Sequence, residues 1–255
     1  MSEVQQKELK RLPLNKTGRV MVNETFSKYT KSLLTCKDPT GLNIGKEVSK
    51  LYNKWKADPI KNVDVYIELS EKIMKEQELI NKALGMKDIA KRMRGELFEE
   101  LVSDILNREI PSLQQVGLKL FRKKRLIVWQ GYVPAKNANF EKQSYQAEFD
   151  LVIGKPLKEK GNIAPIIAIS CKTNPGAGDL QMDALRFSLL KTIYPKVVCL
   201  FVATPSRTGE KVSIKESLKY ALWNFLDDIF VLDNKGEINR FIEKVKESLS
   251  KFVFA

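Results

Sequence analysis

The sequence has 255 residues, of which 44 are Lys or Arg and 31 are Asp or Glu, and its formal net charge is +13. It contains no histidine, which excludes Ser-His-Asp hydrolysis, histidine-assisted cysteine chemistry and His-ligated zinc deaminase sites. Catalysis would therefore need carboxylates, lysine and a metal ion. The positive charge favours a partner dense in phosphate, and nucleic acid stands ahead of an anionic membrane.

The first part of the chain has a helical pattern. Apolar residues recur at helical spacing from Phe26 to about Arg108. We expect residues 1–84 to form a helical N-terminal region that packs on the rest of the chain, dimerises or contacts DNA, and residues 85–255 to form the catalytic domain. The expected helices lie near 45–57, 62–83 and 87–108, with interruptions at 39–41 and 58–59.

After residue 111 the pattern changes to short apolar runs typical of strands, and helical spacing then returns. This order predicts an α/β (α+β mixed) fold with a central mixed β-sheet flanked by helices. The expected strands are 117–121, 126–133, 147–153, 166–172 and 196–203, and the later helices are about 180–192, 213–225 and 237–252.

Two of these strands carry one charged residue each. Asp150 lies within the run AEFDLVIG, and Lys172 closes the run PIIAISCKTN. Because alternate side chains of a strand share a face, Ser170 and Lys172 point one way, and Cys171 points into the core with the neighbouring isoleucines. The polar link 154–162 is long enough for a hairpin, so we expect the strands to pair antiparallel.

An aspartate and a lysine on neighbouring strands suit a metal-dependent nuclease. The carboxylate of Asp150 would hold a divalent cation, and the ammonium of Lys172 would act on the water that attacks a phosphate. Each residue also has a structural interpretation, since Asp is common in caps and turns and Lys protects strand edges. Their occurrence together in a basic chain favours the nuclease.

The residues around Lys172 resemble those of the PD-(D/E)XK nuclease superfamily. Most members have Glu or Asp two residues before the lysine, where this chain has Ser170. Ser170-Cys171-Lys172 is similar to the variant found in type II restriction endonucleases of the CCGG-recognising group. The segment 203–207, Ala-Thr-Pro-Ser-Arg, resembles that group's Pro-Ser-Arg segment, whereas its Arg-Ser/Thr-Asp-Arg motif is missing after Lys172.

The resemblance implies a Mg²⁺ site and indicates which groups would bind the ion. Asp150 and the backbone carbonyl of Cys171 would bind the metal, with Ser170 beside it. The missing acid would come from the following helix, where Asp183 lies among Leu180, Phe187 and Leu190. The alternative is that Asp183 is a first-turn residue favoured by the helix dipole.

A further acid is expected from the helix before the strands. Glu99 lies at the edge of the apolar stripe of KRMRGELFEELVSDIL, one turn from Gly95, and Gly-x-x-Phe-Glu resembles the superfamily's helical glutamate motif. The alternative is that Glu96, Glu99 and Glu100 all belong to a solvated face.

Several residues are candidates for DNA contact. A basic turn between two strands suits the phosphate backbone, and Arg207 could bond a guanine edge in a bidentate manner. The three tryptophans lie in apolar contexts and are expected in the core. The candidates are Arg122, Lys123, Lys124 and Arg125 in the basic turn, with Asn174, Arg186, Ser206 and Arg207 elsewhere.

These observations predict a type II site-specific deoxyribonuclease that uses Mg²⁺, leaves 5′-phosphates, and forms a homodimer or a larger symmetric oligomer on double-stranded DNA. The alternatives are a structure-specific or repair nuclease of the same superfamily and a non-catalytic DNA-binding protein on a decayed nuclease fold. No apolar run approaches the ~18 residues of a membrane span, and the odd cysteine count argues against disulfides. A cytoplasmic prokaryotic protein without membrane association is expected.

Overall fold

The computed structural model describes residues 25–134, 140–158, 162–173, 177–204 and 225–253. The chain forms two compact units, 1–97 and 98–255, and the point in the sequence where they divide lies within the range of α6 (Ile89–Glu109). The chain leaves helical structure between α5 and α6, at residues 85–88, whereas the two units divide after residue 97. The assignment of 85–255 as the catalytic domain stays a prediction.

The N-terminal unit is helical where it is described. Asp38 caps α3, because its side chain accepts a hydrogen bond from the backbone N–H of Thr40 at 2.9 Å and Pro39 occupies the first helical position. Gly85 ends α5 with φ of 67°, a conformation that favours glycine. The helix expected over 62–83 is two helices that meet at Glu76. The elements are α2 (Phe26–Leu34), α3 (Pro39–Ala57), α4 (Val63–Lys75), α5 (Gln77–Leu84) and the start of α6.

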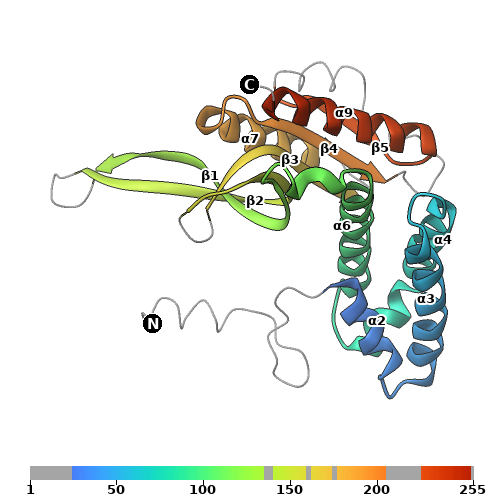
Figure 1. The fold of residues 1–255 in the computed structure, drawn as a ribbon. Coiled ribbons are helices and arrows are strands. Elements are labelled where there is room, and N and C mark those ends of the chain that lie inside the picture. The colour runs from blue at the N-terminus through green and yellow to red at the C-terminus, as the bar shows by residue number, and fades with distance from the viewer. Residues whose placement is uncertain (1–24, 135–139, 159–161, 174–176, 205–224, 254–255) are drawn as a thin grey trace. The chain divides into compact units, whose positions relative to one another are not determined.

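The C-terminal unit contains a five-stranded sheet in the order β1-β2-β3-β4-β5 (Figure 1). The pairs β1–β2 and β2–β3 are antiparallel and the pairs β3–β4 and β4–β5 are parallel, so the sheet is mixed as predicted. The strands are β1 (Lys119–Pro134), β2 (Phe140–Pro156), β3 (Ile163–Thr173), β4 (Val198–Thr204) and β5 (Asp228–Val231). The other elements are η1 (Pro111–Gln114), α7 (Ala177–Ile193) and α9 (Lys235–Val253).

Helices cover both faces of this sheet. Phe187 of α7 packs with Cys199 and Phe201 of β4 in one core cluster. Phe230 of β5 is paired with Val202, whose side chain points away from that cluster, and Phe230 contacts Phe241 of α9 with ring centroids 5.3 Å apart. The predicted α/β fold with a mixed sheet between helices is therefore confirmed.

The sequence prediction of a basic turn at 121–125 is wrong. Arg122, Lys124 and Arg125 are paired with residues of β2, and they lie inside the single continuous strand β1. The two strands expected at 117–121 and 126–133 are one strand, because the pairing with β2 continues through the charged segment. Trp129, which was expected in the core, is 38% exposed, whereas Trp55 is fully buried.

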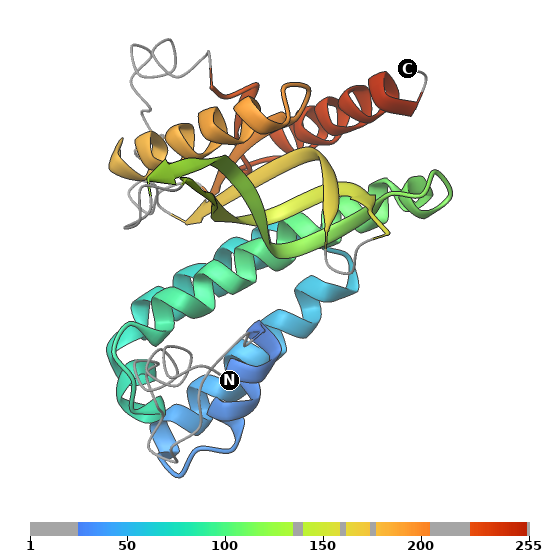
Figure 2. The same ribbon diagram turned by 90° about the vertical axis from the view of Figure 1, so that its left-hand side faces the viewer.

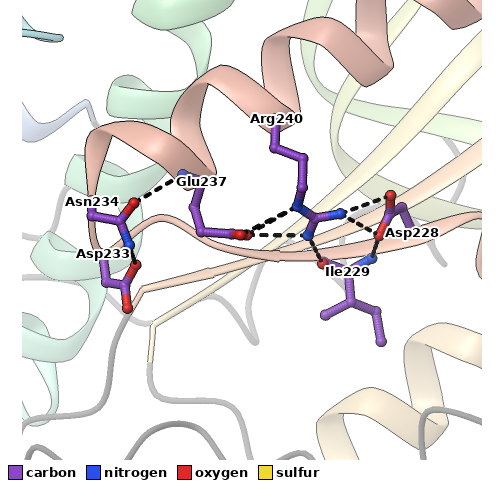
Figure 3. Close-up of polar contacts among 6 residues, drawn as sticks. All are labelled: Asp228, Ile229, Asp233, Asn234, Glu237 and Arg240. Atoms are coloured by element: carbon purple, nitrogen blue, oxygen red, sulfur yellow. Dashed lines mark hydrogen bonds and ion pairs between the residues drawn. The ribbon is translucent and has the colours of Figure 1, made fainter.

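Arg240 fixes the start of α9 to the last strand (Figure 3). Its guanidinium donates to both carboxylate oxygens of Asp228 at 3.0 Å and to the backbone carbonyl of Ile229 at 2.7 Å. It also pairs with Glu237 and lies 4.1 Å from the ring centroid of Phe230. A planar, five-donor group is needed to satisfy these partners together.

We predict that Arg240→Ala lowers the free energy of unfolding by about 1–2 kcal/mol, because several hydrogen bonds and a ring contact are lost together. Urea denaturation followed by circular dichroism measures the change. Lys251→Ala is the matched control, since Lys251 pairs with Glu247 on the exposed side of the same helix. Its effect should stay below about 0.5 kcal/mol, and equal losses in the two variants would contradict the prediction.

Candidate active site

Four polar residues from three elements converge at the end of β3. Asp150 comes from β2, Ser170 and Lys172 from β3, and Asp183 from α7. Two local features bring them together. Alternation in β3 turns Ser170 and Lys172 toward the face that α7 covers, and Phe149 stacks on Phe187 with ring centroids 5.6 Å apart. The stack links Phe149, the residue before Asp150, to Phe187, which lies one helical turn after Asp183.

Asp183 is buried, with 3% of its surface exposed, and it has three polar partners. The hydroxyl of Ser170 donates to its Oδ2 at 2.6 Å, and the Nζ of Lys172 lies 3.3 Å from the same oxygen. Arg186 donates to Oδ1 at 3.2 Å. A buried carboxylate is costly unless it is paired, and these contacts supply two cations and a hydroxyl.

Asp150 is half-buried at the opposite side of Ser170. Its Oδ2 accepts a hydrogen bond from the backbone N–H of Cys171 at 2.6 Å and a longer one from the hydroxyl of Ser170 at 3.4 Å. Burial raises the pKa of Asp150, the Cys171 N–H and the ammonium of Lys172 oppose the rise, and the charge of Asp183 adds to it. The site thus holds two acidic groups that repel one another.

Glu99 of α6 brings a third carboxylate. Burial, and after it the nearby charge of Asp150, raise its pKa from 4.5 to about 7, although Arg122 opposes the rise. Arg122 Nη2 lies 3.3 Å and Lys123 Nζ 3.9 Å from Glu99 Oε2. The interpretation of these glutamates as a solvated face is wrong. Glu96, Glu99 and Glu100 are all at least nine-tenths buried.

The backbone of β1 departs from regular strand geometry opposite Asp150. In the register of β1 and β2, Arg122 pairs with Leu151 and Lys124 with Phe149, so Lys123 lies across from Asp150. Lys123 has φ of 48°, in the left-handed region that non-glycine residues seldom adopt. This bend allows Arg122 and Lys123, two neighbouring residues, both to reach Glu99.

The chemistry of this donor set fits a hard cation. Among the described residues, no donor contacts the second oxygen of Asp150 or the second oxygen of Glu99. Carboxylate and carbonyl oxygens are the ligands that Mg²⁺ prefers, and Mg²⁺ commonly uses one or two carboxylates and keeps several waters. Within the same residues, no three His, Cys, Asp or Glu side chains form a group that could by itself hold a metal ion. The thiol of Cys171 is a poor ligand, since burial raises its pKa well above 9.0.

The predicted DNA-contact residues are distributed unevenly. Arg122 and Lys123 pair with Glu99, and Arg186 pairs with Asp183, so these three residues belong to the carboxylate site. No local sequence pattern indicates this for Arg122 and Lys123, because the contact depends on the bend in β1. Lys124 lies over the ring of Phe121, and Arg125 pairs with Glu148 at the surface. Asn174, Ser206 and Arg207 lie outside the described residues.

No protein-family model matches the sequence, and no curated protein matches it. The chain is similar in fold to the native BbvCI A2B2 tetramer, with 14% identity, coverage of 81% of this chain and 76% of that chain, and a TM-score of 0.47. It is also similar to the Bse634I restriction endonuclease, with 11% identity, 69% and 84% coverage and a TM-score of 0.44. For the type IIF restriction endonuclease Bse634I with cognate DNA, the identity is 11%, the coverage 71% and 85%, and the TM-score 0.43.

Among the helices that the structure describes, none combines the length and the apolar character needed to cross a membrane.

The raised pKa of Glu99 predicts how the stability of the metal-free protein depends on pH. Because Glu99 titrates at about 7 when folded and near 4.5 when unfolded, the folded state binds more protons between these values. The free energy of unfolding should therefore decrease as the pH rises from about 4.5 to 7, by roughly 3 kcal/mol or less from this group.

Glu99→Gln should remove most of that decrease, and urea denaturation at a series of pH values measures it. A smaller decrease should remain from Asp150, whose pKa is raised in the same direction. A Glu99→Gln variant that keeps the full pH dependence would show that folding does not raise the pKa of Glu99.

Proposed function

We propose that this protein is a site-specific, double-stranded DNA endonuclease of restriction type that hydrolyses phosphodiesters with Mg²⁺ and leaves 5′-phosphates. The observation that carries the proposal is the meeting of Asp150 and Asp183 at one serine hydroxyl, with the Lys172 ammonium 3.3 Å from Asp183. Carboxylates beside an ammonium suit the hydrolysis of phosphate esters, because they hold a cation and a water next to each other. The absence of histidine from the sequence leaves this chemistry as the available one.

Asp150, Asp183, Glu99 and the backbone carbonyl of Cys171 are the groups that would hold Mg²⁺. When bound, the metal would supply Lewis-acid stabilisation of charge on the phosphate oxygens. Within the described part of the chain, Asp150 and Glu99 each have one oxygen with no donor against it, whereas both oxygens of Asp183 already have partners. Asp183 would therefore have to exchange its contact with Lys172 for the metal, and that exchange would free the ammonium.

Lys172 would orient the attacking water. Its Nζ would donate a hydrogen bond to the water oxygen and stabilise the hydroxide that forms when the proton passes to solvent. Ser170 would keep the two aspartates in place, since its hydroxyl lies within 3.4 Å of one and 2.6 Å of the other. Arg186 would remain with Asp183 and limit its movement.

The substrate and the assembly follow from charge and symmetry. A net charge of +13 suits the polyanionic backbone of DNA. Cleavage of both strands of a palindromic site needs two active sites, so a homodimer or a larger symmetric oligomer is proposed. A structure-specific nuclease with the same site would cut only at junctions or ends, whereas a restriction enzyme would give defined fragments from plasmid DNA.

A non-catalytic DNA-binding protein is the second candidate. It is favoured by the contacts of Asp183, whose two oxygens are already neutralised by Lys172 and Arg186. A chain that binds duplex DNA but cuts no plasmid, junction or DNA end in the presence of Mg²⁺ would select this candidate.

We predict that Lys172→Ala abolishes cleavage of mixed-sequence plasmid DNA while duplex binding is kept, because the ammonium would act on the attacking water. The cleavage rate should decrease by roughly 10³-fold or more, as measured by agarose gels and by sequencing of the fragment ends. Lys191→Ala is the matched control, since Lys191 is similarly half-buried and pairs with Asp227 outside the site.

The control should keep cleavage close to the wild-type rate. Unchanged nicking and cleavage by Lys172→Ala would exclude the proposed role of Lys172 and with it the proposed mechanism.

Mg²⁺ binding should strengthen as the pH rises through about 7, because Glu99 must lose its proton to bind a cation. Isothermal titration of the DNA-free protein with Mg²⁺ at pH 6 and pH 8 measures the change and the protons released. In the Glu99→Gln variant the affinity should be lower and its pH dependence weaker. An affinity that does not change with pH would show that Glu99 is not a ligand.

A further inference from the structure

The outer part of the β1–β2 hairpin extends beyond the sheet as an arm, which we define as residues 129–134 and 140–146. Figure 1 shows the two strands running out past the other elements of the sheet, and Figure 2 gives the view from that side. Within the described residues, the strand β3 pairs with β2 only from Leu151 onward, so the arm is a two-stranded ribbon. Such a ribbon is marginally stable in water without something that covers it.

The arm exposes large aromatic side chains. Tyr132 is 69% exposed, Phe140 is 66% exposed and Tyr145 is 59% exposed, and Trp129 is exposed as well. Trp129 pairs with Tyr145 on one face, and its ring lies over Gly131, where a Cβ would come within 2.6 Å of it. Exposed aromatic residues in this number mark a binding surface rather than a random surface composition.

The aromatic residues are divided between the two faces of the arm. Alternation places Trp129 and Tyr145 on one face and Tyr132 and Phe140 on the other. Neither face is the single apolar surface that a second copy of the chain would bury. Both faces would instead be enclosed if the ribbon entered the major groove of DNA, which is about 12 Å wide and admits a two-stranded ribbon.

The other side chains of the arm suit base edges and phosphates. They are amides, a hydroxyl and an ammonium, and the described part of the arm has one carboxylate, that of Glu141. Glutamine side chains can bond adenine in the major groove in a bidentate manner. The polar residues are Gln130, Lys142, Gln143, Ser144 and Gln146.

The arm is continuous with the strand that carries Asp150. At about 3.3 Å per residue, Tyr145 lies roughly 17 Å and Phe140 roughly 33 Å along β2 from Asp150. One turn of B-DNA is about 34 Å long. A duplex whose scissile phosphate lies at Asp150 therefore has a groove within reach of the arm.

We propose that this arm is a DNA-binding element that enters the major groove and contacts about one turn of duplex beside the cleavage site. The inference rests on the proposed function, because it places the scissile phosphate at Asp150. Tyr132 and Phe140 would contact the groove on one face, and the paired Trp129 and Tyr145 would contact the adjacent backbone on the other.

The double variant Tyr132→Ala with Phe140→Ala tests the proposal. Both side chains are mostly exposed, so their removal should leave the fold intact, which thermal denaturation checks. The affinity for a pool of 40-base-pair duplexes of mixed sequence is measured by fluorescence anisotropy in metal-free, low-salt buffer. We expect at least tenfold weaker binding by the variant. Leu157→Ala is the control, since Leu157 is exposed outside the arm, and its affinity should stay within twofold of the wild type.

The outcomes separate the arm from the nuclease. If the wild-type chain binds and cuts duplex DNA and the double variant does so equally well, the arm proposal fails and the proposed function stands. If the wild-type chain neither binds nor cuts duplex DNA, both fail. If the double variant sediments as a smaller species than the wild type, the arm contacts a second copy and the proposal is overturned.

A photo-crosslinking amino acid in place of Tyr132 gives a direct test. Irradiation of the complex with labelled duplex should transfer the label to the protein, and the same substitution at Leu157 should transfer little. If position 132 instead crosslinks to a second protein chain and no label is transferred from the DNA, the proposal is overturned.

Discussion

The candidate site depends on the burial of one carboxylate, that of Asp183. This group lies under the helix α7 with almost no exposure, and its charge is balanced by Lys172, by Arg186 and by the hydroxyl of Ser170. An unpaired charge at this position would cost several kcal/mol. The same contacts draw β3 and α7 together and orient the lysine, so the stability of the site and its proposed chemistry share one set of residues.

Ser170 and Asp183 are suited to each other. At 2.6 Å from Asp183, the hydroxyl donates a hydrogen bond where a second carboxylate would repel. Asp183 from the helix and Ser170 from the strand therefore stabilise each other. Asp150, on the other side of the serine, is the second carboxylate of the site. This arrangement gives a physical reason for a serine two residues before Lys172, where a carboxylate is the usual residue in the family that the sequence resembles.

The sequence predicted the features that depend on local patterns. Alternation in the run ending at Lys172 correctly placed Ser170 and Lys172 on one face of β3, where both contact Asp183, and the apolar stripe around Asp183 correctly indicated a buried helix face. The errors came from non-local pairing. A charged run such as 121–125 resembles a turn, and only its partners in β2 keep it in a strand. Glu99 and Glu100 resemble a solvated face because Arg122, which pairs with both, is more than twenty residues away in the sequence.

Binding of Mn²⁺, followed by electron paramagnetic resonance, shows whether Asp150 and Asp183 form one cation site, since Mn²⁺ takes the oxygen ligands that Mg²⁺ takes and its free signal disappears on binding. The wild-type chain should remove the free signal, and Asp150→Asn and Asp183→Asn should each restore most of it, whereas Asp227→Asn, outside the site, should not. Equal binding by the wild type and both site variants would contradict the claim that these two carboxylates form one cation site.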